Sequence, residues 1–277
     1  MLLTPRYDDA PALQADGLIG DPSIPLLRQR RRFAHLLAML EPEQWSSATR
    51  CERWSVQDVV MHLVGVNQLW QLSFEGAHAG TPTRLFQYFD PAVTPAQHVA
   101  AMPEWTPSET LARFVETNDA LAAVLADSDE DTWAQTGESP LGHVTLRLVA
   151  VHALWDSWIH ERDVLLPLGI TPVEEPDEVL ACLWYAAALG PALLATRGST
   201  RRGTLAVDAT DPRVQVVITA GPHVTVVPGV TRPDLAQLSG HAAELAEGLS
   251  LRQELAVVVA SDDRWLLSGL DAAFDHD

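Results

Sequence analysis

The sequence contains no lysine, so arginine supplies all 18 of its basic side chains. Aspartate and glutamate together number 37, which leaves a net charge of −19. A protein that binds nucleic-acid phosphates needs a basic surface, because lysine and arginine carry most of that affinity. The charge therefore argues against nucleic-acid binding, and no nucleic-acid partner is expected.

Cysteine is scarce as well. Cys51 and Cys182 are the only two cysteines, and they stand far apart, outside any spacing typical of paired thiolate ligands. The sequence therefore predicts neither a disulfide framework nor a zinc site built on thiolates. Both cysteines are expected to be reduced core residues.

Uninterrupted apolar runs are also missing. The first ten residues include Pro5, Asp8 and Asp9, where a signal peptide requires apolar side chains. The most apolar later stretch, residues 180–195, contains Gly190 and Pro191. We therefore expect no membrane partner and a cytoplasmic protein.

The remaining composition is that of a folded protein. Charged residues make up 20% of the chain, hydrophobic residues make up 47%, and nine tryptophans require burial. A chain of 277 residues is long for one domain and predicts a large domain followed by a smaller one.

The first part of the chain has helical periodicity. After an irregular arm at 1–22, apolar residues recur at helical spacing over 24–40, 56–72, 107–126 and 143–165. Ser55 followed by Asp58 predicts a capping box before the second segment, and Thr106 with Glu109 predicts one before the third. Four long helices joined by loops with proline and glycine predict a helical bundle over residues 1–170.

Four arginines are concentrated on the first predicted helix, at positions 28, 30, 31 and 32. Such a cluster could bind an anion. In a chain with a large acidic excess, a solvated helix face that pairs with carboxylates is the preferred interpretation.

The pattern changes after residue 169. Residues 170–177 contain two prolines and three acidic side chains, which predicts a linker, and a helix is expected over 178–196. Segments 204–208, 214–219 and 224–227 are rich in β-branched residues and bounded by turn signals, which predicts an antiparallel meander. A strand at 236–239, a helix at 242–249, a strand or buried helical turn at 254–260 and a helix at 262–274 complete the predicted elements. The predicted class is α+β, with a small α+β domain over 171–277 that carries an antiparallel sheet.

Polar residues occupy positions where the helical period calls for apolar ones. His62 lies among the core-facing positions of segment 56–72. In segment 143–165, His152, Asp156 and His160 are spaced by four and share one strip of the helix surface. An ionised aspartate buried between two imidazoles is costly unless a proton or a metal ion offsets its charge.

This arrangement can present one oxygen and two nitrogens to a cation while positions stay open for water or substrate. A site of that kind would be catalytic rather than structural. A core histidine is more often structural, and an aspartate four residues before a histidine recurs by chance. The residues alone therefore leave both interpretations open.

Two segments resemble a known family. The segment that starts at Trp45 and continues through TRCERWSVQDVVMHL (49–63) is similar to the start of the mycothiol-dependent maleylpyruvate isomerase family, within the DinB-like superfamily. HALWDSWIHERDV (152–164) resembles its second motif, and segments 207–212 and 238–245 resemble its small α+β domain. The likeness spans most of the chain, and the two helical motifs are its specific part.

The resemblance implies a DinB-like four-helix bundle with a divalent metal ion, usually zinc, in its core. The matching ligand positions are His62, Asp156 and His160. Family members most often have glutamate at the carboxylate position, so Asp156 is a departure that shortens the reach by about 1.5 Å. The helix would then sit closer, a water would bridge, or His152 would enter the ligand shell instead.

The resemblance also implies a low-molecular-weight thiol such as mycothiol as a cofactor, and a small electrophilic substrate. A bound metal ion deprotonates such a thiol near neutral pH, and the thiolate attacks activated carbon. The enzyme is an isomerase if the adduct expels the thiol, and an S-transferase if the adduct is released. A non-catalytic metal- or ligand-binding DinB-like protein and a metal-hydroxide hydrolase are the alternatives.

Overall fold

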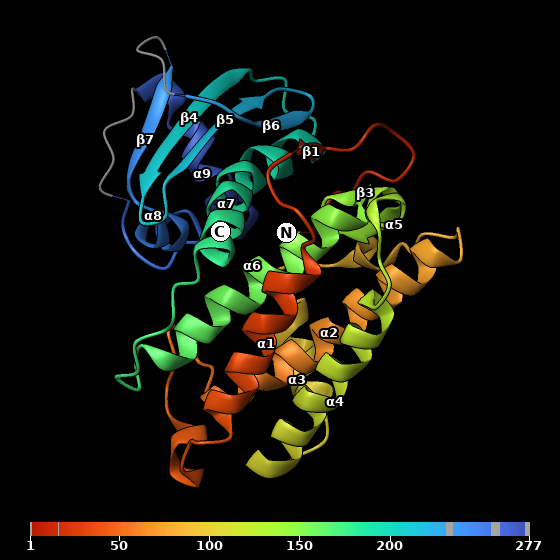
Figure 1. Cartoon of the computed structure of the whole chain (residues 1–277), viewed down its shortest axis with the longest axis vertical. Coiled ribbons are helices and arrows are strands. Elements are labelled where there is room, and N and C mark those ends of the chain that lie inside the picture. Colours follow the sequence, from red (N-terminus) through yellow and green to blue (C-terminus); the bar gives the residue numbers. More distant parts are fainter. Residues whose placement is uncertain (1, 16, 231–234, 256–260, 275–277) are drawn as a thin grey trace.

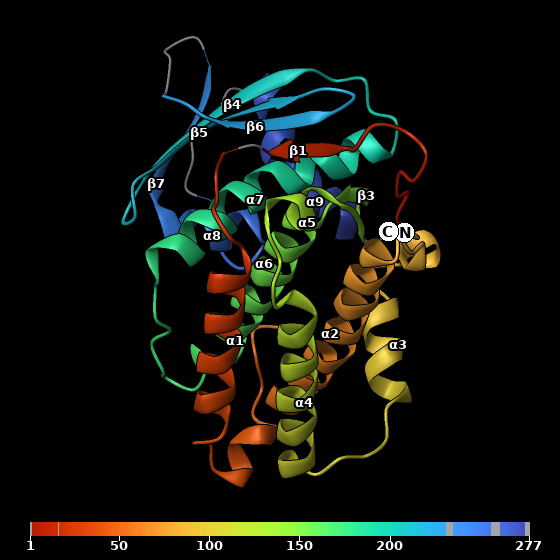
Figure 2. The same cartoon turned by 45° about the vertical axis from the view of Figure 1, so that its right-hand side comes forward.

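The computed structural model describes residues 2–15, 17–230, 235–255 and 261–274. Four long helices form the predicted bundle, in which α1 and α2 each pack against α4 and α6 (Figures 1 and 2). They are α1 (Ser23–Leu37), α2 (Val56–His78), α4 (Pro107–Leu125) and α6 (Leu146–Leu165). The shorter elements around them are η1 (Pro42–Ser46), η2 (Leu85–Tyr88), α3 (Thr94–Ala101) and α5 (Glu130–Ala134).

The last bundle helix begins later than predicted. Strands β2 (Thr136–Ser139) and β3 (Gly142–Thr145) pair as an antiparallel hairpin, so the helix expected from residue 143 begins at Leu146. The backbone of Arg6 lies against this hairpin, where its N–H donates to the Leu141 carbonyl and its carbonyl accepts from the His143 N–H. Gly142 makes this approach possible, because its φ is +97° and a Cβ there would lie 2.0 Å from the Arg6 carbonyl oxygen.

The second layer is a five-stranded sheet of order β1-β6-β5-β4-β7. Its strands are β1 (Leu13–Ala15), β4 (Gly203–Thr210), β5 (Val214–Ala220), β6 (Val224–Pro228) and β7 (Ala236–His241). The predicted antiparallel meander is correct for β4, β5 and β6. The sheet as a whole is mixed, because at its two edges β1 pairs with β6 in parallel and β7 pairs with β4 in parallel.

The expectation of an irregular arm over 1–22 is therefore wrong at Leu13–Ala15, which form strand β1. This strand has only three residues, and its hydrogen-bonding partner lies more than two hundred positions further along the chain. No local periodicity can reveal a strand that depends on so distant a partner.

Helix α7 (Pro176–Thr196) lies between the two layers (Figure 2). It packs on α6 on one side, and on β5, β6, α8 (Ala242–Leu249) and α9 (Trp265–Phe274) on the other. By length and composition alone α7 could span a membrane, but 83% of its most apolar window is buried inside the molecule, as in the core helix of a soluble protein. One apolar core runs through both layers. A short helix η3 (Ser261–Asp263) precedes α9, and most of the element expected at 254–260 lies outside the described residues.

Candidate metal centre and its surroundings

The start of α2 positions His62. The capping box forms as expected, with the Asp58 N–H donating to Ser55 Oγ at 3.2 Å and the Ser55 N–H donating to Asp58 Oδ2 at 2.8 Å. Trp54, just before the cap, packs its indole ring against the imidazole of His62, with ring centroids 5.1 Å apart. The helix start and this ring contact together hold His62 toward α6.

Helix α6 brings its polar strip to the same place. The imidazole rings of His62 and His160 meet edge to face with centroids 5.0 Å apart, and His160 Nε2 lies 3.7 Å from Asp156 Oδ1. One ligand atom from each of His62, Asp156 and His160 lies within 4.8 Å of the others. The structure thus brings together the three positions that the sequence singled out, and we call them the core triad.

The other nitrogen of His160 is occupied. Its Nδ1 hydrogen-bonds Asp163 Oδ2 at 3.1 Å. Asp163 in turn accepts from Arg252 Nε at 2.9 and 3.0 Å and from Arg50 Nε at 3.1 Å. A carboxylate on Nδ1 fixes the imidazole orientation and leaves Nε2 directed at Asp156, as in carboxylate–histidine pairs behind metal ions.

Charge at the triad is poorly compensated. Burial opposes the cationic form of His160, but electrostatic interaction with Cys51, the hydrogen bonds to Asp163 and Cys51 and the charge of Asp156 raise the pKa of His160 to about 10. Burial raises the pKa of Asp156, and burial with the nearby charges of His160 and His98 lowers the pKa of His62 far below its usual value. Without a metal ion His160 is therefore protonated, and its Nε2 proton faces Asp156 at the point where a cation could replace it.

Two features of the triad suit a divalent cation. Asp156 Oδ2 is buried without a hydrogen-bond partner among the described residues, so one carboxylate oxygen is available. The lowered pKa of His62 keeps that imidazole neutral, which is the form that coordinates metal ions. Once a cation displaces the Nε2 proton of His160, two imidazole nitrogens and one carboxylate form a donor set that zinc accepts in catalytic sites.

His152, the alternative ligand on α6, lies one turn from Asp156 and has other partners. Its Nδ1 is 2.6 Å from the hydroxyl of Tyr185, and its ring packs between Trp70, Trp155 and Tyr185. Burial lowers the pKa of His152 to about 3. It belongs to neither cluster of possible metal ligands that the described residues form.

The second such cluster joins Cys51, His160 and Asp163. Cys51 Sγ lies 3.1 Å from Asp163 Oδ2 and 3.6 Å from His160 Nδ1. The guanidinium groups of Arg50 and Arg252 already neutralise Asp163, so a further cation there would meet two positive charges at close range. The core triad is the better cation site.

Cys51 and Arg252 show what the sequence left undetermined. Cys51 is only partly buried and borders the site, so the expectation of a core cysteine is wrong for it and correct for Cys182. Nothing in the spacing between positions 51 and 160 indicates this contact. Arg252 reaches Asp163 from the loop after α8, where no local pattern points toward the bundle.

Arg30 is a further charged neighbour of the triad. It is fully buried in the bundle, where it donates to Asn67 Oδ1 and to the Ala153 carbonyl. Burial lowers the pKa of Arg30 to about 10, and the charge of Asp156 acts in the opposite direction. The predicted pairing with carboxylates is correct for Arg28 and Arg32, which bind carboxylates of α6 and α7 although both are partly buried, and the predicted solvated face is wrong for Arg30.

Residues 26–165 match the family described as the mycothiol maleylpyruvate isomerase N-terminal domain. The chain is also similar to the crystal structure of the mycothiol-dependent maleylpyruvate isomerase, at a TM-score of 0.59 and 15% sequence identity, over 84% of this chain and 88% of that chain. A histidine-to-alanine mutant of that enzyme is similar to the same degree. At this identity the two structures establish the fold. No curated protein sequence matches the chain.

Proposed function

Since the chain belongs to the mycothiol maleylpyruvate isomerase family, we propose that it is a mycothiol-dependent isomerase of small unsaturated acids, with the core triad as its metal site. The observation that carries this proposal is the convergence of His62, Asp156 and His160 within 4.8 Å. All three positions lie in the part of the chain that matches the family.

The triad would hold one divalent cation, most simply zinc, through a nitrogen of His62, an oxygen of Asp156 and Nε2 of His160. Such a cation lowers the pKa of a thiol beside it, so that a nucleophilic thiolate is present near neutral pH. Three protein ligands leave a further position for an exogenous group.

Neighbouring residues prepare His160 for this role. Asp163 accepts the Nδ1 hydrogen bond and also pairs with Arg50 and Arg252. Burial raises the pKa of Asp163, but hydrogen bonds and charges from His160 and Arg252 lower it below its usual value, so the carboxylate stays ionised. A cation at the triad would displace the Nε2 proton and leave the remaining imidazole proton at Nδ1, on the side of Asp163. Cys51 lies on this Nδ1 side, so the chain's own thiol is not directed at the triad and the attacking thiol comes from outside.

The reaction is a reversible addition. The external thiolate adds to one carbon of an activated cis double bond, and its electron pair forms the carbon–sulfur bond while the π electrons move into the adjacent carbonyl. Rotation about the resulting single bond follows. The carbonyl then returns its electrons, the carbon–sulfur bond breaks and the thiolate leaves, so the trans isomer forms and no thiol is consumed.

The test combines the zinc-loaded protein with mycothiol and maleylpyruvate and follows the double-bond geometry by NMR. We expect catalytic conversion of cis to trans, with mycothiol recovered unchanged. Loss of activity with chelator and recovery with zinc would support the metal site. A stable thioether product would identify an S-transferase, and no turnover with metal demonstrably bound would overturn a thiol-dependent function.

A further inference from the structure

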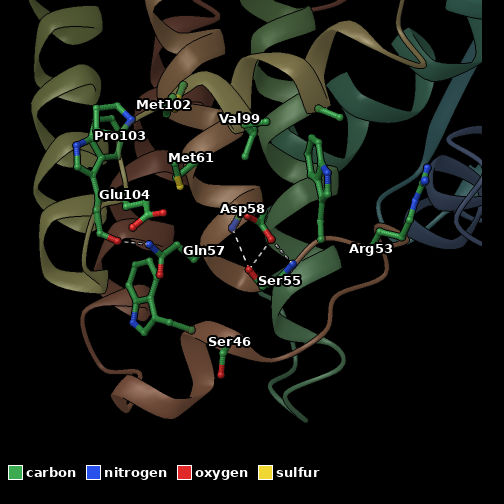
Figure 3. Close-up of a pocket in the computed structure, with 15 residues that line it drawn as sticks. Ser46, Arg53, Ser55, Gln57, Asp58, Met61, Val99, Met102, Pro103 and Glu104 are labelled. Carbon is green, nitrogen blue, oxygen red and sulfur yellow. Dashed lines mark hydrogen bonds between the residues drawn. The ribbon is translucent and has the colours of Figure 1, made fainter.

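A groove of about 630 Å³ lies beside the start of α2 (Figure 3). Its walls come from η1, the first turns of α2, helix α3 and the segment that links α3 to α4. The volume falls within the range of small-molecule sites, about 300 to 1,000 Å³. The bundle helices alone do not form it, since α3 and the following segment close one side.

Both aromatic and polar side chains line this groove. Trp54 and Trp105 contribute partly exposed indole rings and Trp45 lies buried in the wall, while Gln57 and Glu104 contribute an amide and a carboxylate. Gln57 Nε2 donates to the Trp105 carbonyl and ties the segment after α3 to α2. Glu104 is exposed, is directed into the groove in Figure 3, and has no hydrogen-bond or ion-pair partner among the described residues.

The groove adjoins the core triad. Trp54 lines the groove and packs against the imidazole of His62 at 5.1 Å. Met102 also lines it, and the same side chain borders a second, much smaller cavity against His62. A ligand in the groove is therefore one side chain away from the first metal ligand, and methionine is the side chain that repacks most readily.

We infer that this groove binds the glycosidic polyol part of the thiol cofactor while the thiol arm passes Met102 toward His62. This inference rests on the proposed function. Mycothiol joins a cysteine to a glucosamine–inositol glycoside, which carries many hydroxyl groups and no permanent charge on its rings. Indole faces pack against the C–H faces of such rings, and carboxylate, amide and hydroxyl groups hydrogen-bond the ring hydroxyls. The groove offers each of these groups.

Blocking the groove tests the inference. Ala100 on α3 is small, exposed and lines the groove, so Ala100→Phe fills it without removing a core contact. Ala101 is its exposed neighbour outside the groove, and Ala101→Phe is the matched control. Trp105→Ala removes one aromatic wall, and Glu104→Gln removes the free carboxylate.

The readout that does not depend on turnover is calorimetric binding of S-methyl mycothiol, whose sulfur cannot form a thiolate. We expect Ala100→Phe and Trp105→Ala to weaken its binding at least tenfold and to raise the KM for mycothiol by a similar factor. Ala101→Phe is expected to match the wild type in both measurements. Metal content should be unchanged in all of these variants.

The outcomes separate the two proposals. Groove-dependent binding of S-methyl mycothiol without any isomerisation would leave the groove assignment standing and overturn the proposed reaction. Isomerisation with wild-type binding and wild-type KM in both Ala100→Phe and Trp105→Ala would overturn the groove assignment alone. Failure of the wild type to bind S-methyl mycothiol would overturn it as well.

Discussion

Single buried side chains determine the electrostatics of the bundle. Asp156 is flanked by His160 and by the buried guanidinium of Arg30, and both lower its pKa against the effect of burial. A buried carboxylate with one unpartnered oxygen between two imidazoles is costly for folding alone. Cation binding at the triad would remove that cost.

The ligand assignment predicts metal content directly. His62→Ala and His160→Ala should each lower bound zinc from about one ion per chain to a small fraction, because two remaining ligands hold zinc poorly. Elemental analysis after dialysis measures this. His78→Ala, which removes an exposed histidine of the same helix α2, is the control and should keep full metal content.

Asp156 can be tested by charge and by length. Asp156→Asn should weaken zinc binding because the anionic ligand is lost, whereas Asp156→Glu should retain it. Loss of metal in His152→Ala together with full metal in Asp156→Ala would show that the assignment is wrong and that three histidines form the site.

His152 predicts a pH dependence of stability. Its pKa is about 3 in the folded protein and about 6.5 when unfolded, so the unfolded state binds the extra proton. The contribution of the neutral His152 to the free energy of unfolding is fully present above pH 6.5 and is lost as the pH falls toward 3. Between pH 7.5 and pH 5 this group should lower the free energy of unfolding by about 2 kcal/mol.

Urea unfolding at the two pH values measures this difference in the wild type and in His152→Gln. The decrease in unfolding free energy from pH 7.5 to pH 5 should be smaller in His152→Gln than in the wild type, by about the same 2 kcal/mol. The same substitution at the exposed His78 should leave the pH dependence of the wild type. Equal acid sensitivity in wild type and His152→Gln would contradict a neutral, buried His152.

At the scale of elements, the β2–β3 hairpin joins distant parts of the chain. Besides the backbone of Arg6, it holds Glu138, whose buried carboxylate accepts from the hydroxyl of Tyr7 and from the N–H groups of Leu85 and Phe86. The hairpin therefore fastens the N-terminal arm and η2 to the bundle. Gly142 is where the arm comes closest.

Gly142→Ala should accordingly destabilise the protein by about 2 to 4 kcal/mol, because the new Cβ meets the Arg6 backbone and the φ is unfavourable for alanine. Gly80→Ala is the matched control. Gly80 also has a positive φ, but nothing lies within 4 Å of the point that a Cβ would occupy, so only about 1 kcal/mol of strain is expected there. Equal unfolding free energies for the two variants in urea would show that the arm does not press on Gly142.

At the scale of the whole molecule, ion pairs connect the bundle to the C-terminal layer. Glu247 on α8 accepts from Arg162 on α6 and from Arg50 at 2.7 Å, and Arg252 reaches Asp163 from the loop after α8. Arg50 and Arg252 both contact the carboxylate that orients His160. The C-terminal layer therefore supports the triad although it contributes no residue to it.

Glu247→Gln should lower the unfolding free energy by about 2 to 4 kcal/mol, because Arg50 and the buried Arg162 lose the carboxylate that they share and Arg162 keeps only the partly exposed Glu174. Glu116→Gln removes a carboxylate from an exposed pair with Arg113 and should cost less than about 1 kcal/mol. Urea unfolding compares the two. Similar small losses in both variants would mean that the contact between the layers contributes little to stability.

The sequence by itself determined the elements with strong local patterns. Helical periodicity located α1, α2, α4, α6 and α7, the capping box marked the start of α2, and β-branched runs located β4, β5 and β6. The spacing of Asp156 and His160 placed both on one helix strip, because an α-helix repeats every 3.6 residues. These properties depend on neighbours within a few positions.

Tertiary structure decided the contacts between distant positions. Strand β1 exists because β6 supplies its hydrogen bonds, and the parallel edges of the sheet depend on connections that no local pattern encodes. The packing of whole elements likewise decides three contacts between distant residues. His62 meets His160, Cys51 and Arg252 meet Asp163, and Arg6 meets Gly142. Periodicity orients a side chain on its own element, whereas its partner across the core is chosen by the packing of the entire chain.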